Sequence, residues 1–498
     1  MKPCKQEVER VAKLGIYDVI PVSMELYADC ITPMEVMRKL KQVSTHCFLL
    51  ESVETSNKWG RYTFLGYDPI LELTCKNHEL TINSAVTIRE TVKHPKEYIR
   101  KILSEYKSPK FPELPPFTGG LVGYFAYEYI KYSEPTLAFD SEKDEEKKDS
   151  FHDVDLMLFD KVIAFDHEKQ KIILIVNVRT KELETNYQKA KFELKKMASL
   201  ITQGEKKKEE PLALVTPFQP LFEKEAFCEM VESAKKHIYE GDIFQVVVSN
   251  LLKAQINGSL LDTYRVLRTT NPSPYMFYFT SDELEIAGAS PETLVKFQEN
   301  KVYTFPLAGT RPRGRNEVED EELEKELLSD TKELAEHNML VDLGRNDIGK
   351  VSKIGSVAVK QYMSIERFSH VMHIGSTVEG VLSEGKDALD AVDAILPAGT
   401  LSGAPKIRAC EIIHQLEKKE RGVYGGALGY IDFTGSMDLC ISIRLAYKKN
   451  GYVYVRSGAG IVADSIPSQE YEECIHKAKA VMNAIKQSEG GIDDDFTD

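Results

Sequence analysis

Two pairs of glutamates stand at helical spacing in the C-terminal half of the sequence. Glu333 and Glu336 are three residues apart in SDTKELAEHNMLVDLGRNDIG, and Glu470 and Glu473 are three apart in SQEYEECIHKAKAVMNAIKQ. Side chains at this spacing project from the same side of a helix. Facing acidic pairs offer the oxygen ligands that Mg²⁺ prefers and leave coordination positions for an anionic substrate. Because such pairs are usually solvated helix faces, other residues must support this interpretation.

Two helices are needed to position these carboxylates. Asp330 can cap the N–H groups at the start of the first helix, with Glu333 closing a capping box, and Gly344 is placed near its end. Pro467 opens the second helix, which puts Lys477 one turn beyond the second acidic pair. The sequence therefore predicts two helices that each present one acidic pair.

Length and charge limit the classes of function. At 498 residues the chain is too long for one core, so we expect two lobes or one large composite domain. The apolar content of 42% and charged content of 29% are those of an ordinary globular protein. The net charge of −14 argues against nucleic acid or a membrane surface as partners. A small anionic substrate would need local cations, a metal ion or backbone N–H groups to bind.

The cysteines and the N-terminus indicate a cytoplasmic protein. No continuous apolar run suggests a signal peptide or a membrane span. The eight cysteines lack CxxC or metal-binding spacing, as is typical of reduced thiols. They are Cys4, Cys30, Cys47, Cys75, Cys228, Cys410, Cys440 and Cys474.

The charged segment QGEKKKEEP, residues 203–211, is the best candidate for a linker. We therefore predict an N-terminal domain over 1–210, a catalytic domain over 211–488 and a disordered acidic tail over 489–498.

A strand predicted over Leu439–Leu445 carries an arginine that could bind a carboxylate. Alternation places Arg444 on the same face as Cys440 and Ser442. The next strand, after the hairpin signal Asn450-Gly451, ends in SGAG. Glycines let an anion approach backbone N–H groups, and a guanidinium can bind a carboxylate through two hydrogen bonds.

Many motifs in one order give a more specific indication. FTGGLVGYFAYE, GDIFQVVVSN, NPSPYM, PLAGTRPRG, EHNMLVDLGRND, SHVMHI, GTLSGAPK, YGGALGY, SIR, SGAG and EYEECIHKA follow one another along the chain. Together they resemble the large subunits of anthranilate synthase, over nearly the whole chain, and residues from about 221 to 488 are similar to the wider chorismate-utilising family. The resemblance implies an α+β fold with two lobes, an antiparallel β-sandwich core and helices packed outside.

The resemblance also implies the roles of particular residues. Glu336 and Glu473 match the family's Mg²⁺ ligands, with Glu333 and Glu470 in support. The implied catalytic residues are His373, Glu333 and Thr400. The implied chorismate-binding residues are Gly309, Thr310, Tyr424, Arg444, Gly458, Ala459, Gly460 and Lys477. A histidine between Met372 and Ile374 is more often a hydrogen-bonded core residue, so its catalytic role depends on the resemblance.

The implied activity is that of a Mg²⁺-dependent carbon–oxygen lyase. Chorismate is a dianion, and Mg²⁺ would offset the repulsion from an acidic protein while easing departure of the ring hydroxyl as ammonia attacks. The intermediate implied is 2-amino-2-deoxyisochorismate, which loses pyruvate to give anthranilate, the first step of tryptophan biosynthesis. Proton transfer by His373 would assist the loss of hydroxide or pyruvate.

Two positions separate this chain from related families. Aminodeoxychorismate synthases carry a lysine where this chain has Ala308, and alanine cannot form a covalent adduct. Isochorismate and salicylate synthases carry a water-activating lysine where this chain has Gln245. Because a neutral amide cannot serve as that base, Gln245 favours ammonia over water as nucleophile. Aminodeoxychorismate synthase and isochorismate synthase remain the enzymatic alternatives.

The resemblance further implies feedback inhibition and a partner. The tryptophan site of the family combines LLES with NPSPYM, which here implies Glu51, Ser52, Pro274, Tyr275 and Met276. We find no nucleophile-elbow cysteine with a matching histidine, so a separate glutamine amidotransferase subunit should supply ammonia, in a heterotetramer of two large and two small subunits. A tryptophan-binding regulatory subunit without catalytic activity is the non-enzymatic alternative.

Overall fold

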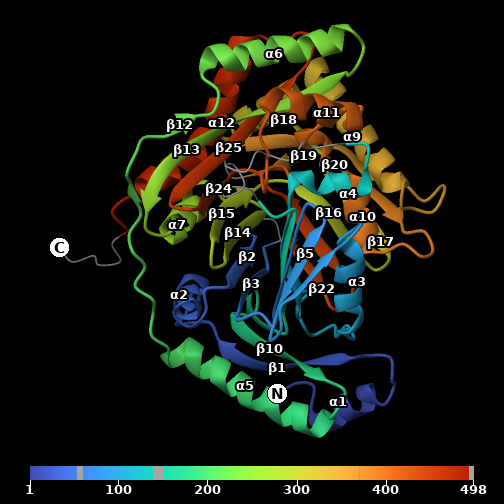
Figure 1. The fold of residues 1–498 in the computed structure, drawn as a ribbon, viewed down its shortest axis with the longest axis vertical. Helices are drawn as coiled ribbons and strands as arrows, with labels where there is room; N and C mark the ends of the chain where they lie inside the picture. Colours follow the sequence, from blue (N-terminus) through green and yellow to red (C-terminus); the bar gives the residue numbers. More distant parts are fainter. Residues whose placement is uncertain (53–59, 138–150, 369–370, 493–498) are drawn as a thin grey trace.

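The computed structural model describes residues 1–52, 60–137, 151–368 and 371–492 (Figure 1). Its strands form two large sheets, and the pairings between the strands named below are antiparallel. In the first sheet the order is β1(Val19–Tyr27), β10(Lys171–Arg179), β9(Lys161–Asp166), β3(Tyr62–Tyr67), β2(Cys47–Glu51), β14(Tyr275–Thr280), β15(Leu284–Ser290), β24(Leu445–Lys449), β25(Tyr452–Ile461), β13(Gln245–Asn257) and β11(Ala213–Leu214), while β12(Gln219–Pro220) and β21(Gly403–Ala404) also pair with β13.

The second sheet begins close to the candidate catalytic histidine. Its order is β18(Leu307–Pro312), β20(Val371–Val381), β17(Lys301–Thr304), β16(Thr293–Gln298), β23(Met437–Ile441), β22(Ala427–Asp432), β7(Gly120–Phe125), β8(Val154–Phe159), β4(Leu71–Lys76), β5(Glu79–Asn83) and β6(Ile88–Thr91), and β19(Ala358–Arg367) pairs with β20.

Aromatic side chains from both sheets meet between them. Phe48 of the first sheet lies edge-on to Phe159 of the second, with ring centroids 4.8 Å apart. Both belong to one buried cluster that also holds Val122, Phe277 and Ile286. Side chains from two inner faces that interlock in this way define a sandwich. The predicted α+β fold with an antiparallel β-sandwich core is confirmed.

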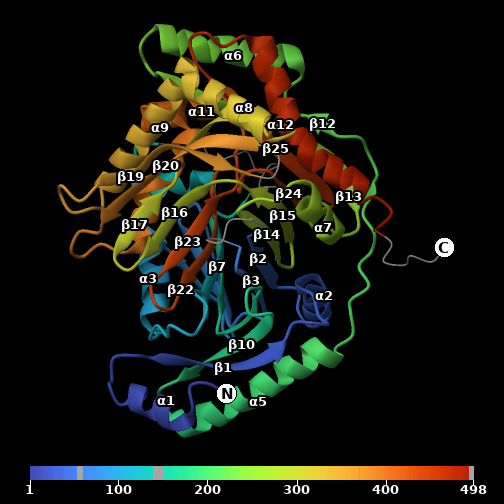
Figure 2. The same cartoon turned by 180° about the vertical axis from the view of Figure 1, so that it is seen from behind.

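Helices cover the outside of both sheets at opposite ends of the molecule (Figures 1 and 2). One end carries α1(Lys5–Ala12) and α5(Leu183–Gln203), and the other carries α6(Lys224–Tyr239), α8(Glu317–Ser329), α9(Thr331–Gly349), α11(Lys406–Glu417) and α12(Pro467–Gln487). Between these ends, α2(Pro33–Val43) and α7(Leu261–Thr270) lie next to each other, with Arg38 of α2 and Asp262 of α7 in an ion pair at 3.6 Å. The smaller helices α3(Lys96–Ser104), α4(Ile130–Ser133) and α10(Ala388–Ile395) lie beside the second sheet.

Both halves of the chain contribute strands to each sheet. β2 pairs with β14 in the first sheet, and β7 pairs with β22 in the second. Residues 204–211, within the predicted linker, run along the outside of the molecule from α5 toward β11, as both ribbon views show. The domain boundary at residue 210 stays a prediction, and residues 493–498 of the predicted tail lie outside the described residues.

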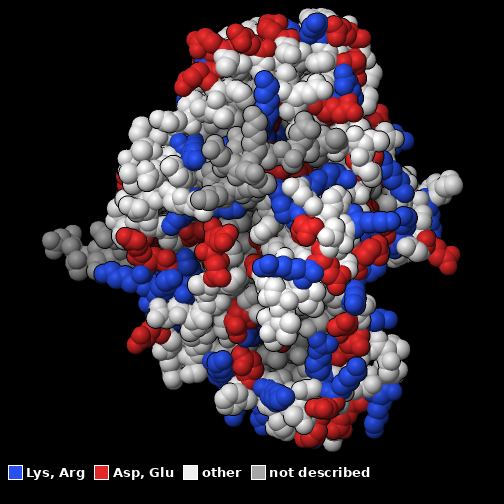
Figure 3. Space-filling model, in the orientation of Figure 1, with Lys and Arg blue, Asp and Glu red and all other residues white. Residues whose placement is uncertain are grey.

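Charged side chains of both signs are mixed over most of the face in Figure 3, while acidic ones gather over α6. Among the described helices, none combines the length and the apolar character needed to cross a bilayer.

Candidate active site

The helix α9 presents the first acidic pair, as predicted. Asp330 caps it, because its carboxylate accepts hydrogen bonds from the backbone N–H groups of Lys332 and Glu333. The predicted end near Gly344 is wrong, since α9 continues to Gly349. A β-carbon at Gly344 would lie 3.0 Å from Cγ2 of Thr304, so this glycine lets α9 pack closely on β17.

The second pair lies on α12, which runs from Pro467 to Gln487 as predicted. Lys477 Nζ lies 2.7 Å from Glu473 Oε1 and donates to the carbonyl oxygen of Gly458 at 3.3 Å. The lysine therefore connects α12 to β25, the strand that contains SGAG.

The carboxylates of the two helices influence one another. Burial raises the pKa of Glu336, and the charges of Glu333 and Glu473 raise it further. Burial and the charge of Glu473 likewise raise the pKa of Glu470. A carboxylate whose charge raises the pKa of another carboxyl group lies close to it in space, so α9 and α12 bring the four predicted carboxylates to one region.

These four carboxylates do not form a closed cage. Over the described ranges, a group of three possible ligand atoms within 4.8 Å occurs at His237, Glu240 and Asp242 and not at the glutamates. At that group Asp242 is already paired with Arg408 at 2.9 Å. The glutamates of α9 and α12 are thus spread around an open region, with Glu473 exposed and Glu336 half-buried.

His373 lies on β20, directly opposite a bulge in β18. Gly309 has φ of +65°, and the register between β18 and β20 shifts between Ala308 and Thr310. The bulge aims the carbonyl oxygen of Gly309 at His373 Nδ1, 2.8 Å away, and Thr310 Oγ1 lies 3.1 Å from the same nitrogen. Because a carbonyl oxygen only accepts, Nδ1 carries the proton and Nε2 keeps a free lone pair.

The imidazole of His373 is buried and neutral. Burial lowers its pKa to about 4, and the charge of Arg444 lowers it further. Nε2 is enclosed and has no hydrogen-bond partner among the residues that the structure describes. Glu333 belongs to the same neighbourhood, because its Oε2 would lie 3.3 Å from a β-carbon at Gly309. The predicted residues Gly309, Thr310, Glu333 and His373 are thus brought together.

Glu292 is a site residue that sequence reasoning missed. Thr400 Oγ1 lies 3.3 Å from Glu292 Oε1 and donates to this carboxyl group. Burial raises the pKa of Glu292 to about 8, although Thr400 and the charge of Arg444 act in the opposite direction. Its position between β15 and β16, in the short segment Ser290-Pro-Glu, looks in the sequence like an ordinary turn.

The predicted continuous strand over Leu439–Leu445 is wrong, because the chain is not in a strand at Arg444. β23 ends at Ile441 in the second sheet, and β24 begins at Leu445 in the first, so the chain crosses between sheets at residues 442–444. Arg444 lies at this crossing in a left-handed conformation, with φ of +51°. Among the described residues its guanidinium has no hydrogen-bond or ion-pair partner, and burial lowers its pKa. It is therefore available to bind an anion.

Tyr424 and the SGAG residues form another wall of the site. A β-carbon at Gly458 would lie 3.1 Å from the Tyr424 hydroxyl, and one at Gly460 would lie 2.8 Å from Gln245 Nε2. Pairing of β24 with β25 ends at Val455, so residues 456–461 have one edge that β24 does not cover. Ala459 instead packs into a buried apolar cluster, and so it can contribute only backbone atoms to the site.

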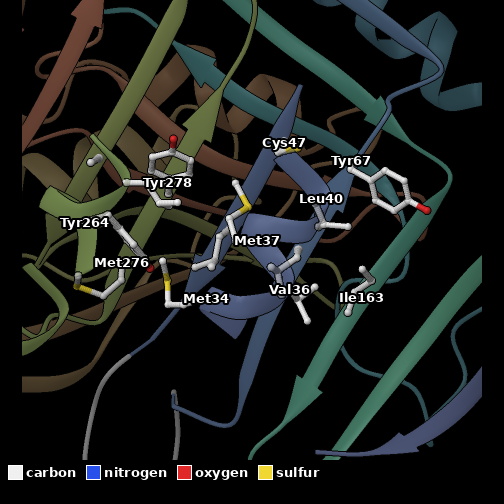
Figure 4. Packing of buried hydrophobic residues seen from close by; sticks show 14 of the residues in the cluster. Met34, Val36, Met37, Leu40, Cys47, Tyr67, Ile163, Tyr264, Met276 and Tyr278 are labelled. Carbon is white, nitrogen blue, oxygen red and sulfur yellow. The ribbon is translucent and has the colours of Figure 1, made fainter. Parts of the chain in front are cut away.

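The residues predicted to bind tryptophan line one large cavity. It has a volume of about 1040 Å³ between the sheets, and its lining includes Glu51, Ser52, Pro274, Tyr275 and Met276. β2 and β14 bring LLES and NPSPYM together, with Met276 opposite Glu51 in the register. Figure 4 shows Met276 in the buried cluster that also contains Tyr264 and Met34.

Glu51 is already satisfied by protein groups. Its carboxylate accepts hydrogen bonds from Tyr264 Oη at 2.6 Å, from Arg268 Nη2 at 3.0 Å and from Thr63 Oγ1 at 3.3 Å. In contrast, Ser52 Oγ is enclosed and finds no hydrogen-bond partner within the described part of the chain. Ser52 is therefore the more available of the two for a bound ligand.

Comparisons with known proteins identify the family of this chain. Residues 45–483 match the chorismate binding enzyme family. Anthranilate synthase component 1 of Acetivibrio thermocellus is 46% identical over 98% of this chain and 99% of its own length, and that of Aquifex aeolicus is 44% identical over 97% and 98%. The structure is similar to anthranilate synthase component I from Streptococcus pneumoniae, with a TM-score of 0.73 and 38% identity over 86% of this chain and 94% of the other. The Escherichia coli isochorismate synthase MenF, 19% identical with a TM-score of 0.69 over 97% and 98% of the two chains, shares the fold. The chain therefore belongs to the chorismate binding enzyme family, among its anthranilate synthase component 1 members.

Proposed function

We propose that this protein is the large subunit of an anthranilate synthase. It converts chorismate and ammonia to anthranilate and pyruvate through 2-amino-2-deoxyisochorismate, at the first step of tryptophan biosynthesis. The observation that carries this proposal is the enclosed Nε2 lone pair of His373, in one site with the acidic pairs and with the Arg444 guanidinium, which no described residue pairs. The named relatives support the choice of reaction.

Arg444 and its neighbours bind the anionic substrate. A half-buried guanidinium that has no partner among the described residues gains much from a carboxylate ligand, because it has already lost part of its water. Tyr424, Thr310 and the uncovered edge of β25 supply hydrogen bonds, and Lys477 adds a second positive charge beside Gly458. This arrangement offsets the repulsion that the net charge of −14 exerts on a dianion.

Mg²⁺ fits the acidic region between α9 and α12. The donors there are carboxylate oxygens. Burial and neighbouring carboxylate charges raise the pKa values of Glu336 and Glu470, and a cation would offset both effects. We propose Glu336 and Glu473 as ligands, with Glu333 and Glu470 in support. When bound, the ion would neutralise the charge of the substrate carboxylate and, by withdrawing electron density through it, would ease loss of the ring hydroxyl group.

Two titratable residues divide the proton transfers. Glu292, with a pKa of about 8, is mostly protonated at neutral pH and can protonate the departing ring hydroxyl, which leaves as water. His373 is neutral, and its free Nε2 can accept the ring proton that is lost as pyruvate departs and the ring becomes aromatic. Thr400 holds the Glu292 carboxyl group in place through its hydrogen bond.

Ammonia is the nucleophile favoured by the site. Gln245 is buried beside Gly460, and a neutral amide cannot act as the base that activates water. Ala308 excludes a covalent adduct at its position. A glutamine amidotransferase subunit would supply ammonia in a cytoplasmic heterotetramer of two large and two small subunits, and the component 1 names of the relatives support a partner.

The first test uses the purified chain with chorismate, Mg²⁺ and ammonium at mildly alkaline pH, followed by anthranilate fluorescence. We expect product that depends on Mg²⁺ and is suppressed by L-tryptophan. Consumption of chorismate without anthranilate would favour aminodeoxychorismate or isochorismate synthesis. Tryptophan binding without any consumption of chorismate would favour the regulatory subunit.

Replacement of Ser52 with alanine should weaken inhibition. The enclosed Ser52 hydroxyl has no partner in the described ranges, so it is free to bond tryptophan, and its loss should raise the half-inhibitory concentration about tenfold. Activity without tryptophan should not change. Ser436→Ala is the matched control, because Ser436 lines the same cavity among other residues. Equal inhibition of all three proteins would show that tryptophan does not use Ser52.

A further inference from the structure

Three charged side chains form a fully buried network beside Tyr424. The side chains of Glu417, Arg421 and Arg456 are each 1% exposed. Glu417 Oε2 accepts hydrogen bonds from Arg456 Nη2 at 2.7 Å and from Arg421 Nε at 3.0 Å. Within the described residues, no second carboxylate bonds to either guanidinium. The network therefore holds two positive charges against one negative charge.

Arg421 connects this network to two parts of the site. Its Nη1 donates to the carbonyl oxygen of Leu401 at 2.6 Å, directly after Thr400. Its Nη2 donates to the carbonyl oxygen of Val247 at 2.7 Å, and Val247 is the register partner of Gly460. One buried guanidinium thus fixes the Thr400 turn relative to the SGAG strand.

Arg456 connects the network to Tyr424 and Gly458. Arg456 and Gly458 are two residues apart on β25, so both face the same side of the sheet. Arg456 Nε donates to Ser249 Oγ at 2.9 Å, and Ser249 is the register partner of Gly458. The Tyr424 ring centroid lies 5.9 Å from Arg421 Cζ and 6.0 Å from Arg456 Cζ. The excess positive charge therefore lies directly behind the Tyr424 and Gly458 wall.

We propose that Arg456, Arg421 and Glu417 are positioning residues that hold this wall and supply one net positive charge to the dianionic substrate. The inference rests on the proposed function for the identity of that substrate. An isolated buried ion pair contributes little to stability, because desolvation offsets the attraction, and an excess charge costs more. In a weakly polarisable interior the same charge acts on a bound anion over several ångströms with little screening by salt.

The test compares charge variants of the whole chain. Arg456→Met makes the network neutral and should raise the dissociation constant and KM for chorismate on the order of tenfold, or about 1.4 kcal/mol of binding free energy, with kcat nearly unchanged. Glu417→Gln combined with Arg456→Met restores one net positive charge and should recover most of this affinity. Arg456→Lys keeps the charge and should bind nearly as the unaltered protein does. Lys161→Met removes a buried cation that pairs with Asp68 and serves as the matched control.

Chorismate binding is measured by calorimetry and turnover by fluorescence, with circular dichroism to establish folding. Binding by Arg456→Met that equals that of the unaltered protein would overturn the inference, as would a double variant weaker than the single one. If the unaltered chain binds chorismate but forms no anthranilate, the proposed function fails, and a weakened Arg456→Met still supports the network. If it binds no chorismate, both fail.

Discussion

Replacing His373 with glutamine should lower kcat for anthranilate formation by roughly 10²- to 10⁴-fold, the range typical of a lost general base. Glutamine can still donate a hydrogen bond to the carbonyl oxygen of Gly309, so the bulge in β18 should persist. Glutamine lacks the enclosed lone pair of Nε2, and Nε2 is the atom of the His373 side chain that can accept a ring proton. Chorismate should bind nearly as well as before, because substrate binding depends chiefly on Arg444 and Lys477.

The pH dependence tests the same assignment. The pKa of His373 is lowered to about 4, so the imidazole is neutral at all pH values above about 5 and should produce no acid limb near pH 6.5. The Glu292 carboxyl group, with its pKa raised to about 8, should produce a fall in kcat as the pH rises through that value. An acid limb near pH 6.5 that is missing in His373→Gln would contradict the assigned protonation state.

His152→Gln is the matched control for this experiment. His152 also has a pKa lowered by burial, but it lies in the N-terminal half, before β8. If both variants lose activity equally, the loss reflects disturbed packing and not catalysis. If His373→Gln keeps full activity, another group accepts the proton.

The elements that carry the acidic pairs could be predicted because their signals are local. Asp330 caps α9 through hydrogen bonds to residues two and three positions away, and Pro467 opens α12. Such contacts are determined by neighbouring residues and can be seen in the sequence. The predicted end of α9 near Gly344 is wrong because a distant contact determines the residue at this position. Glycine is needed there for close packing against Thr304, and it does not end the helix.

The position of Arg444 could not be predicted from alternation. The apolar alternation continues from Leu439 to Leu445, yet the chain leaves one sheet at Ile441 and joins the other at Leu445. Only the packing of two sheets built from both halves of the chain determines where such a crossing falls. Glu292 was missed for a similar reason, since its raised pKa comes from burial by distant segments.

The order of the motifs along the chain predicted a contact between distant segments that the periodicity of apolar residues does not indicate. LLES and NPSPYM are more than two hundred residues apart in the sequence, yet β2 and β14 are adjacent strands. Nothing in either segment alone indicates this pairing. The buried network of Glu417, Arg421 and Arg456 shows the remaining limit, because charged residues in a sequence look exposed until their partners are known.

Replacing Glu336 with glutamine should raise the Mg²⁺ concentration needed for half-maximal activity by about 10- to 100-fold. The carboxylate has its pKa raised by burial and by Glu333 and Glu473, so above its pKa its charge destabilises the metal-free fold. The pKa of Glu336 is 4.5 in the unfolded chain and higher in the folded protein. The contribution of this group to the free energy of unfolding is therefore highest below pH 4.5, and it falls as the pH rises through the pKa of the folded state. At pH 8 in a chelator, Glu336→Gln should therefore unfold at the same temperature as the unaltered protein or at a higher one.

Mg²⁺ should then raise the unfolding temperature of the unaltered protein and raise that of Glu336→Gln much less, because a ligand that binds the native state stabilises it more when its affinity is higher. Glu232→Gln is the matched control, since Glu229 and Glu232 form an exposed pair at the same spacing on α6. That variant should keep the full Mg²⁺ response. If instead Glu336→Gln unfolds earlier in the chelator and responds to Mg²⁺ normally, the α9 pair has a structural role. The acidic face of α9 would then resemble that of α6, and the ligands of the ion would have to be sought elsewhere in the site.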